Sequence, residues 1–339
     1  LSRGLGDVYK RQGMALAWVT AWPLRYILAV AKLLSKLPGA VLFTGNRMVV
    51  WWLVLVYAMF GAAWLISHRR KVRYWIPAAC SVLALCAVLT VNAVQLQRTS
   101  TVTALDVSQG QSIVFSSGRA CAVVDCGGRS TAEDPGDLAA RKLLAQGHRS
   151  LDLLVLTHPH DDHVNGVLRL MHWLPVRTLV IPAAADTTQA PLSDILVLAE
   201  ENHTAVVRVD AERTVTAGGI SVHLYPEPCA GQEDGSMIVL ASIGDYDTLV
   251  PGDVDMTAEV KFLSSCTYPG IELLLVGHHG SNRSTSDAWL DAIAPDAAII
   301  SVGYNTYGHP TSETLERLQA HNIPIYRTDQ MGDITVHLS

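Results

Sequence analysis

A run of twenty residues without a single charge, MVVWWLVLVYAMFGAAWLIS (48–67), constrains this chain more than any other stretch. A helix of this length crosses the hydrocarbon core of a bilayer, which is about 30 Å thick. Trp51, Trp52 and Trp64 lie toward its ends, where interfacial aromatic residues collect. A second apolar run follows at 74–97, after the basic segment HRRKVR. The sequence therefore predicts two membrane spans, in preference to a helical hairpin buried inside a large soluble protein.

The distribution of charge divides the chain near Arg98. The first hundred residues hold twelve Lys and Arg but one acidic residue, whereas the remainder holds thirteen basic and thirty acidic residues. Such a break predicts a basic membrane region followed by an acidic globular domain. The basic loop between the spans predicts, by the positive-inside bias, a cytoplasmic loop and a domain on the outer face of the membrane.

The residues before the first span form two segments that differ in their hydrophobic periodicity. The segment WPLRYILAVAKLLSKLP (22–38) carries Arg25, Lys32 and Lys36 at helical spacing, which favours an interfacial amphipathic helix, with a packed core helix as the alternative. Residues 1–13 show no period and are expected to be a non-native or disordered leader. We therefore expect a leader at 1–13, a membrane region at 14–100 with spans at about 48–67 and 74–97, and one folded domain at 101–339.

From Thr101 onward, short apolar runs alternate with segments of helical spacing. The predicted strands lie at 101–107, 111–117, 121–128, 152–158, 178–182, 220–226, 236–244, 247–253, 272–281, 297–303 and 333–338. The predicted helices lie at 137–147, 191–202, 256–265, 287–293 and 312–322. This mixture predicts an α/β domain whose sheets are covered by helices, long enough to bury a substantial core.

Residues 154–166, LVLTHPHDDHVNG, place several imidazoles and carboxylates directly behind a predicted strand. These side chains bind divalent metals, and the spacing H-x-H-x-D-H offers four ligands on one turn. The four are His158, His160, Asp162 and His163. A solvated loop with one capping aspartate is the alternative, but capping does not require so many imidazoles. The pattern therefore predicts a metal site at the end of this strand.

The motif resembles that of the metallo-β-lactamase superfamily, whose hydrolases carry H-x-H-x-D-H at this place in an αββα four-layer sandwich. The resemblance implies two divalent metal ions, Zn or Mn, one held by His158 and His160 and the other by Asp162 and His163. It also implies a bridging carboxylate at a strand end, which Asp253 in TLVPGDVDM supplies, and a further histidine after the next strand. His278 and His279 in LLLVGHHGS both stand at that place, and we favour His279.

The sequence departs from the superfamily pattern in one loop. Many members have another histidine for the first metal in the loop that corresponds to PEPCAGQEDGSMIV (226–239), which contains none. His172, His203 and His223 lie in segments that we interpret as helix or strand, where a structural or surface role is more consistent than ligation. We therefore expect the first ion to be held more weakly than the second.

A narrower resemblance covers about residues 101–339. The segments that carry it are LDVSQGQSIVF, VVDCGG, LTHPHDDHVNG, GDVD, HHGSNRSTS and IISVGYNTYGHP. Together they are similar to the C-terminal domain of ComEC-type DNA-uptake channel proteins, and the two preceding spans agree with it. Typical members read D-V-G-Q-G-D at 106–111, where this chain has Gln111 in place of the last aspartate, and they commonly lack the third-motif histidine as well. The resemblance implies the cytoplasmic (inner) membrane as the location, DNA as the substrate, and other DNA-uptake proteins and the rest of the channel as partners.

Two ions a few ångströms apart activate water for attack on phosphorus and neutralise the phosphate oxygens. The residues to which we assign catalytic roles are Asp162, Asp253, His278 and His309. Asp162 would orient the nucleophile, and the histidine that is not a ligand would hold a phosphate oxygen or protonate the leaving group. For His309 a structural role in its turn is an equal alternative. The candidate substrate contacts are Ser281, Asn282 and Arg283.

The favoured function is a membrane-tethered, extracytoplasmic, metal-dependent nuclease domain of a bacterial DNA-uptake channel. The acidic charge of the domain argues against a continuous DNA-binding surface, since such surfaces are basic; a local patch of Arg283 with Arg129 or Arg327 would compensate. One alternative is an extracellular metallohydrolase acting on another phosphodiester or ester, such as a phosphorylcholine-like group, which a small closed pocket would favour. The other alternative is a non-catalytic DNA-guiding module, which the missing histidine favours.

Overall fold

The computed structural model describes residues 18, 21–34, 47–67, 73–129, 133–226 and 236–338. The chain divides into two compact units, residues 1–43 and 44–339. The described part of the first unit is a helix over 21–34 with mostly exposed side chains, within the segment expected to be amphipathic. The expected leader and most of the basic loop between the spans lie outside the described residues.

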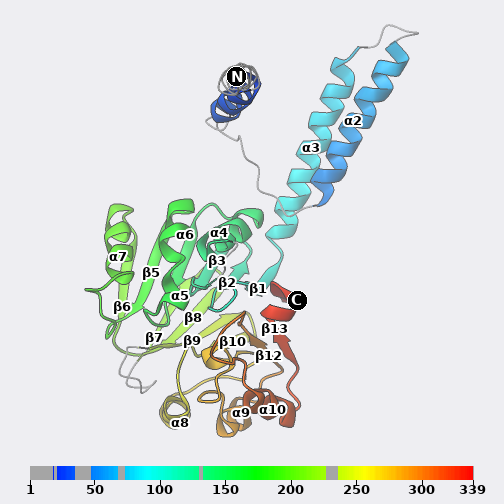
Figure 1. The fold of residues 1–339 in the computed structure, drawn as a ribbon. Coiled ribbons are helices and arrows are strands. Elements are labelled where there is room, and N and C mark those ends of the chain that lie inside the picture. Colours follow the sequence, from blue (N-terminus) through cyan, green and yellow to red (C-terminus); the bar gives the residue numbers. More distant parts are fainter. Residues whose placement is uncertain are drawn as a thin grey trace, which may run out of the picture. The chain divides into compact units, whose positions relative to one another are not determined.

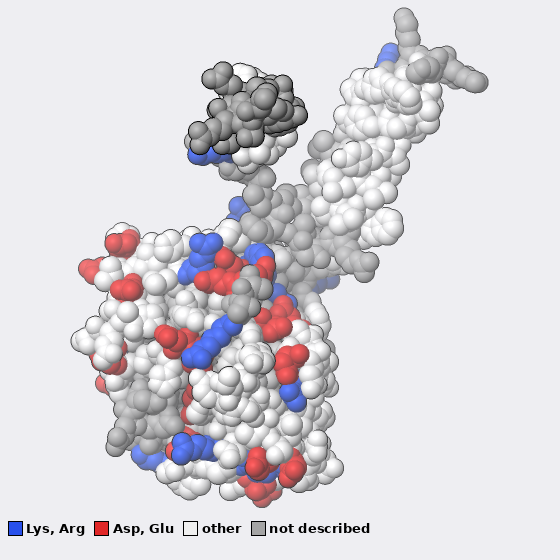
Figure 2. All heavy atoms as spheres, viewed as in Figure 1, with Lys and Arg blue, Asp and Glu red and all other residues white. Residues whose placement is uncertain are grey.

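Two long apolar helices, α2 (Arg47–Ser67) and α3 (Trp75–Leu96), lie side by side at the start of the second unit (Figure 1). Trp52 Nε1 donates a hydrogen bond to the Ser81 carbonyl, 2.8 Å away, and so joins them. Both helices are long and apolar enough to cross a membrane, and only 6% of the most apolar window of each is buried. Figure 2 shows their surface almost free of charged side chains. A core helix of a soluble protein would be mostly buried, so this exposure is consistent with membrane spans.

The remainder of the second unit contains two seven-stranded sheets. The first sheet has the order β14 (Ile334–Leu338), β1 (Ser100–Ala104), β2 (Ile113–Ser117), β3 (Ala120–Val124), β4 (Leu151–Val155), β5 (Val176–Pro182) and β6 (Ala205–Val209). The second sheet has the order β13 (Ile325–Arg327), β12 (Ala297–Ile300), β11 (Leu273–Leu275), β10 (Tyr246–Val250), β9 (Ile238–Ile243), β8 (Ile220–Tyr225) and β7 (Arg213–Ala217). In each sheet one half pairs antiparallel and the other half parallel. The parallel halves matter for function, because the carboxyl ends of their strands meet at one edge.

Helices cover the outer face of each sheet, as Figure 1 shows. On the first sheet these are α4 (Pro135–Ala145), α5 (Asp161–Val164), α6 (Val167–Trp173) and α7 (Leu192–Glu201). On the second they are α8 (Met256–Ser265), α9 (Asp287–Ile293) and α10 (Ser312–Ala320), and a short α11 (Thr328–Met331) follows β13. Apolar residues between the sheets, such as Phe115 and Val239, form a separate core. The layers are thus helix, sheet, sheet and helix, which confirms the predicted αββα sandwich.

Local sequence explains where the helices begin. At four of them a side chain accepts a hydrogen bond from a backbone N–H of the first turn and so satisfies one of the free donors there. The capping residues are Asp134 of α4, Asp255 of α8, Ser286 of α9 and Thr311 of α10. The predicted starts of α8, α9 and α10 agree with the structure, whereas α4 begins two residues earlier than predicted because Pro135 occupies its first turn.

Three strands were missed by the sequence prediction: β6, β7 and β13. Each is the outermost strand of its sheet. The side chains of β6 and β7 are mostly exposed. An edge strand packs on fewer neighbours, so its sequence has less need of a long apolar run.

Substitution of Leu154 tests how much the central strand β4 contributes to the stability of the sandwich. Its side chain is fully buried, and we expect Leu154→Ala to lower the free energy of unfolding by about 2–5 kcal/mol, because truncation leaves a cavity. Pulse proteolysis of the chain in detergent over a urea series measures this change. Val197→Ala, which truncates a 58% exposed side chain on α7, is the control and should change stability by less than about 0.5 kcal/mol. Equal effects of the two substitutions would contradict the assigned core.

Candidate metal centre

The carboxyl end of β4 leads directly into the H-x-H-x-D-H motif. His158 is fully buried after the strand, and His160 precedes the single turn α5 that carries Asp162 and His163. The backbone of this turn is anchored, since Gln111 N–H donates to the Asp162 carbonyl at 3.0 Å. Gly127 permits the close approach, because a Cβ at that position would lie 2.5 Å from the His163 nitrogen. The turn is therefore held by neighbouring backbone and not by the motif alone.

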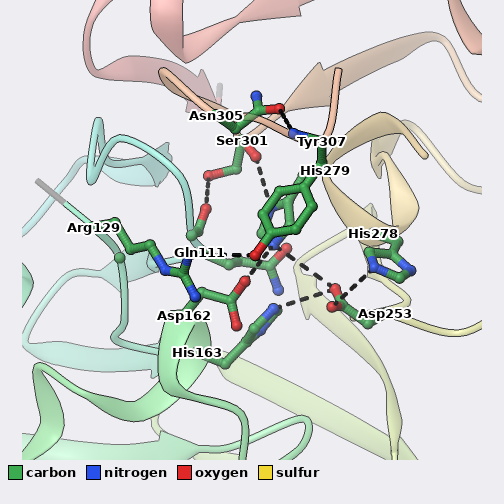
Figure 3. Close-up of polar contacts among 12 residues, drawn as sticks. Gln111, Arg129, Asp162, His163, Asp253, His278, His279, Ser301, Asn305 and Tyr307 are labelled. Carbon is green, nitrogen blue, oxygen red and sulfur yellow. Dashed lines mark hydrogen bonds and ion pairs between the residues drawn. The ribbon is translucent and has the colours of Figure 1, made fainter. Parts of the chain in front are cut away.

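The second sheet brings Asp253 and His279 to the same place. Asp253 follows β10, and its Oδ1 lies 3.2 Å from His163 Nε2 while its Oδ2 lies 3.6 Å from His158 Nε2. His279 follows β11, and its Nε2 lies 3.5 Å from Asp162 Oδ2 and 3.9 Å from Asp253 Oδ1. Figure 3 shows Asp162 and His163 of the first sheet converging with Asp253 and His279 of the second. Residues 90 to 121 positions apart in the sequence thus share one site.

We refer to six of these residues as the ligand cluster: His158, His160, Asp162, His163, Asp253 and His279. They form two groups, His158 with His160 and Asp253, and Asp162 with His163 and His279. Within each group one potential ligand atom of every residue lies within 4.8 Å of the others. This is the division that the resemblance implied, with Asp253 next to both groups.

A second observation fits metal binding: three histidine nitrogens of the cluster are buried without hydrogen bonds to any described residue. Nε2 atoms of His158, His163 and His279 are buried and have no hydrogen-bond partner among the described residues. Buried polar atoms are normally hydrogen-bonded, and three such nitrogens facing carboxylates are readily explained by shared cations. Imidazole and carboxylate donors suit zinc and manganese. The residues present therefore fit divalent metal ions.

Electrostatics keep most of the cluster in forms that can bind a cation. Burial acts to raise the pKa of Asp253, but His163 and His158 outweigh it and hold that pKa well below its usual value. Burial likewise acts to raise the pKa of Asp162, but the nearby imidazoles of His279 and His163 outweigh burial and lower it. Burial lowers the pKa of His158, so that this imidazole is neutral at pH 7. Burial opposes the charge on His163, yet the carboxylates of Asp253 and Asp125 raise its pKa well above 6.5.

Asp125 is a functional residue that the sequence analysis missed. Its fully buried carboxylate accepts hydrogen bonds from His163 Nδ1–H at 2.7 Å, from the Thr157 N–H and hydroxyl at 2.7 Å each, and from Gln111 Nε2 at 2.8 Å. The bond to Nδ1 leaves His163 Nε2 to face Asp253, as outer carboxylates do for metal-binding histidines. Asp125 lies in the segment VVDCGG, inside the strand predicted at 121–128, whereas the observed β3 ends at Val124 just before it. Gln111, where the related pattern has an aspartate, acts here by holding Asp125.

The loop after β11 is held in an uncommon backbone conformation. His278 and His279 have φ values of 51° and 55°, in the left-handed region that costs a non-glycine residue roughly 1–2 kcal/mol. His279 Nδ1–H donates to the Ser301 carbonyl at 2.9 Å, which turns Nε2 toward the cluster. The buried carboxylate of Glu259 on α8 accepts hydrogen bonds from the backbone N–H groups of Thr285 and Ser286. Such strain persists only where surrounding contacts impose it.

Three further residues that the sequence analysis predicted to be functional, His278, His309 and Ser281, lie near the ligand cluster or in its loops. His278 is more exposed than His279, with its Nε2 3.7 Å from Asp253 Oδ2, so the geometry favours His279 as the ligand. The His309 ring lies 5.7 Å from that of His278, and burial and His278 lower the pKa of His309. Ser281 is 4% exposed and its hydroxyl accepts a hydrogen bond from Arg283 N–H, which shapes the loop; its role as a substrate contact stays a prediction.

None of the three intervening histidines reaches the cluster. His172 lies exposed on α6, and His223 on β8 pairs with Glu212 at 2.7 Å. His203 was expected in a helix or strand, but it lies in the turn after α7 with a φ of 56°. A positive φ suits a turn that ends a helix. The helical spacing of the sequence did not show that the helix ends before His203. Most of the loop that lacks the third-motif histidine lies outside the described residues.

Two pockets adjoin the cluster, and because they share lining residues we refer to them together as the groove and to each as one of its arms. The first arm is lined by Gln109, Arg129, Pro159, His160, Asp161, Asp162, Ala190, Pro191, Asp253, His278, His279, Tyr307 and His309. The second arm is lined by His160, Asp253, Asp255, Met256, Thr257, His278, Asn282 and Arg283. The arms share His160, Asp253 and His278. Two of the three predicted substrate contacts, Asn282 and Arg283, therefore lie in the groove.

This fold and this convergence of histidines and aspartates define a class of protein. Residues 105–304 match the metallo-beta-lactamase superfamily, and the chain belongs to it. It is 29% identical over 251 residues to "ComE operon protein 3" of Bacillus subtilis, covering 68% of this chain and 32% of that protein. It is also 29% identical over 237 residues to "Competence protein ComA" of Neisseria gonorrhoeae, covering 68% of this chain and 31% of that protein. The chain thus spans about a third of the length of these relatives.

Among solved structures, the chain is similar to the metallo-beta-lactamase fold protein YhfI from Bacillus subtilis. The sequence identity is 12% and the TM-score is 0.49, with 71% of this chain and 100% of that chain covered.

Asp125→Asn tests the hydrogen-bond network behind the cluster. An amide cannot accept all four hydrogen bonds and has no negative charge to raise the basicity of the His163 ring, so metal affinity should fall by about 10- to 100-fold. Competition with a chromogenic chelator measures the affinity of the purified chain for Zn²⁺ and Mn²⁺. Asp245→Asn, in the exposed turn between β9 and β10, is the matched control and should bind as the unchanged chain does. Unchanged affinity of Asp125→Asn would show that this network does not support a metal site.

Proposed function

We propose that this chain contains the membrane-tethered, metal-dependent nuclease domain of a bacterial DNA-uptake channel. The observation that carries the proposal is the convergence of the ligand cluster beside the groove. The similarity to a competence protein supports DNA as the substrate. Because the chain spans about a third of its curated relatives, the channel itself is part of the proposal.

The chemistry follows from the groups that face the groove. Two divalent ions in the cluster would supply Lewis acidity and an activated water for attack on a phosphodiester. Asp253 belongs to the first group and lies 3.2 Å from His163 of the second, so it joins them, and Asp162 would orient the attacking water. His309 has a lowered pKa and is neutral at pH 7, so one ring nitrogen donates to a phosphate oxygen. His278 lies beside it on the groove side of the cluster, where a leaving oxygen would be protonated.

The shape of the site favours a polymer over the two alternatives. A small ester such as a phosphorylcholine-like group would suit one closed pocket, whereas two open pockets with different linings meet here at the cluster. A non-catalytic guiding module would have no need of two groups of metal ligands with buried nitrogens turned toward them. Both observations support hydrolysis of an extended phosphodiester.

We also propose that α2 and α3 cross the cytoplasmic membrane, with the hydrolase domain on its outer face. Spans at about 48–67 and 74–97 then precede a domain at 101–339. Residues 97–99 connect α3 to β1, and Gly118 N–H donates to the Thr99 carbonyl at 3.4 Å. So short a connection would keep the domain close to the membrane surface.

Nuclease activity is tested with the whole chain purified in detergent and supplied with Mn²⁺ or Zn²⁺. Linear DNA, supplied as single strands and as duplex, should be cut in at least one of these forms, and Asp253→Ala should lower the rate by more than roughly 100-fold, beyond the loss typical of an outer-shell residue. Asp245→Ala should retain the rate, and chelation should abolish it reversibly. Cutting of bis(p-nitrophenyl) phosphate but not DNA would support the other hydrolase. DNA binding without any hydrolysis would support the guiding module.

The orientation is tested with alkaline phosphatase fusions expressed in a Gram-negative host. Fusion after Leu338 should be active, because that enzyme folds in an oxidising compartment, whereas insertion into the loop at 68–72 should be inactive. The reverse pattern would place the hydrolase domain in the cytoplasm and remove incoming DNA as its substrate.

A further inference from the structure

The first arm of the groove carries a cation and an aromatic ring that the ligand cluster does not use. Arg129 lies in the loop after β3 of the first sheet, and Tyr307 lies in the loop between β12 and α10 of the second. The two side chains meet, with Arg129 Nη1 donating to the Tyr307 hydroxyl at 3.3 Å. Figure 3 shows them reaching toward each other beside Asp162. The pair therefore spans the two halves of the domain next to the candidate metal centre.

The same arm contains buried polar atoms that lack hydrogen bonds. Gln109 is 2% exposed and lines the arm, and its Oε1 has no hydrogen-bond partner among the described residues. Nδ1 of His309, in the same arm, is also buried without such a partner. Because buried polar atoms are normally satisfied, these two atoms indicate that a ligand with polar groups of its own occupies the arm.

A series of rings leads along the arm toward the cluster. The Tyr307 side chain is 59% exposed, and its ring lies 5.8 Å from that of His309 at an angle of 31°. The His309 ring lies 5.7 Å from that of His278. Proteins that bind unpaired strands stack bases on such exposed aromatic faces. A base inside a duplex is already stacked on its neighbours and has no free face to offer.

The charged side chains in the groove indicate which charged groups a ligand there would have. Asp161 and Asp162 line the first arm and Asp255 lines the second, so an anion binds only where cations offset these carboxylates. Among the described lining residues, Arg129 is the one arginine or lysine of the first arm and Arg283 that of the second. A chain of phosphates that crosses the groove thus meets one guanidinium on each side of the cluster.

We propose that Arg129 and Tyr307 are a positioning pair that holds one nucleotide of an unpaired polynucleotide strand beside the ligand cluster. The Tyr307 ring stacks on the base, and Arg129 binds the neighbouring phosphate. Arg283 binds a phosphate in the other arm, so that the scissile phosphodiester lies between the two arginines. This inference rests on the proposed nuclease function and adds the form of the substrate, a single strand.

Fluorescence anisotropy tests the stacking contact without any need for catalysis. A labelled single-stranded oligonucleotide with a backbone that cannot be hydrolysed is titrated with the whole chain in detergent and Mn²⁺. Tyr307→Ala should raise the Kd by about 5- to 150-fold, the range that stacking of one base on an aromatic ring contributes. Tyr307→Phe keeps the ring and should change the Kd by less than about 2-fold. Tyr304→Ala is the matched control, since Tyr304 is 90% exposed and is not among the lining residues.

The dependence of binding on salt tests the phosphate contact separately. Arg129→Gln should lower the slope of log Kd against log salt by about 0.7, the value for one phosphate of a single strand. Tyr307→Ala should leave the slope unchanged, because stacking releases no counterion. Arg177→Gln is the control: Arg177 pairs with Asp152 at 2.9 Å, at the opposite end of β5 from the cluster.

Three outcomes would overturn the inference: an unchanged Kd for both Arg129→Gln and Tyr307→Ala, equal weakening by Tyr304→Ala, or tighter binding of duplex than of single strand. Hydrolysis of bis(p-nitrophenyl) phosphate separates this result from the nuclease proposal. The unchanged chain should cut that diester, which reports on the metal centre whether or not the pair binds a strand. A chain that binds single strands through the pair and cuts nothing would overturn the nuclease function and support the positioning pair.

Discussion

The candidate metal centre depends on one buried contact, the hydrogen bond and ion pair between Asp125 and His163. His163 lies between Asp125 of the first sheet and Asp253 of the second, with ring nitrogens 2.7 Å and 3.2 Å from their carboxylates. A charge in so dry a position is stable only when it is paired. The same carboxylate fixes Thr157 at the end of β4 and thereby the start of the metal motif. One aspartate thus connects the core of the fold to the ligands.

The acidic residues of the domain have a specific role at the groove, where Asp162 and Asp253 are candidate metal ligands. The carboxylates that repel a phosphate are the ones that would hold cations, so that anion binding becomes conditional on metal. Arg129 and Arg283 lie outside the cluster, one in each arm. This arrangement reconciles an acidic domain with an anionic polymer without a broad basic surface. Figure 2 agrees, since the viewed face mixes acidic and basic side chains and shows no continuous basic patch.

Much of the fold was predictable because its signals are local. Buried strands require apolar runs, and the caps of α8, α9 and α10 stand directly before helical spacing, so these elements were identified from the sequence. The edge strands β6, β7 and β13 were missed, because their position in the sheet depends on neighbours far along the chain. The H-x-H-x-D-H motif was recognisable since four of its ligands fall within six residues. Asp125 was not, since a single aspartate after a strand carries no pattern of its own.

The sequence by itself determined the chemistry available to this protein: two apolar segments long enough for a bilayer, an acidic α/β domain, and a dense set of imidazoles and carboxylates at strand ends. Only the tertiary structure decided which of these side chains meet. It turned His279 inward and left His278 on the groove, buried the hydroxyl of Ser281, and joined Arg129 to Tyr307 across the two sheets. The physical reason is that local spacing governs helices, strands and turns. A functional site, in contrast, is built where the ends of distant strands converge, and sheet order and packing set that convergence.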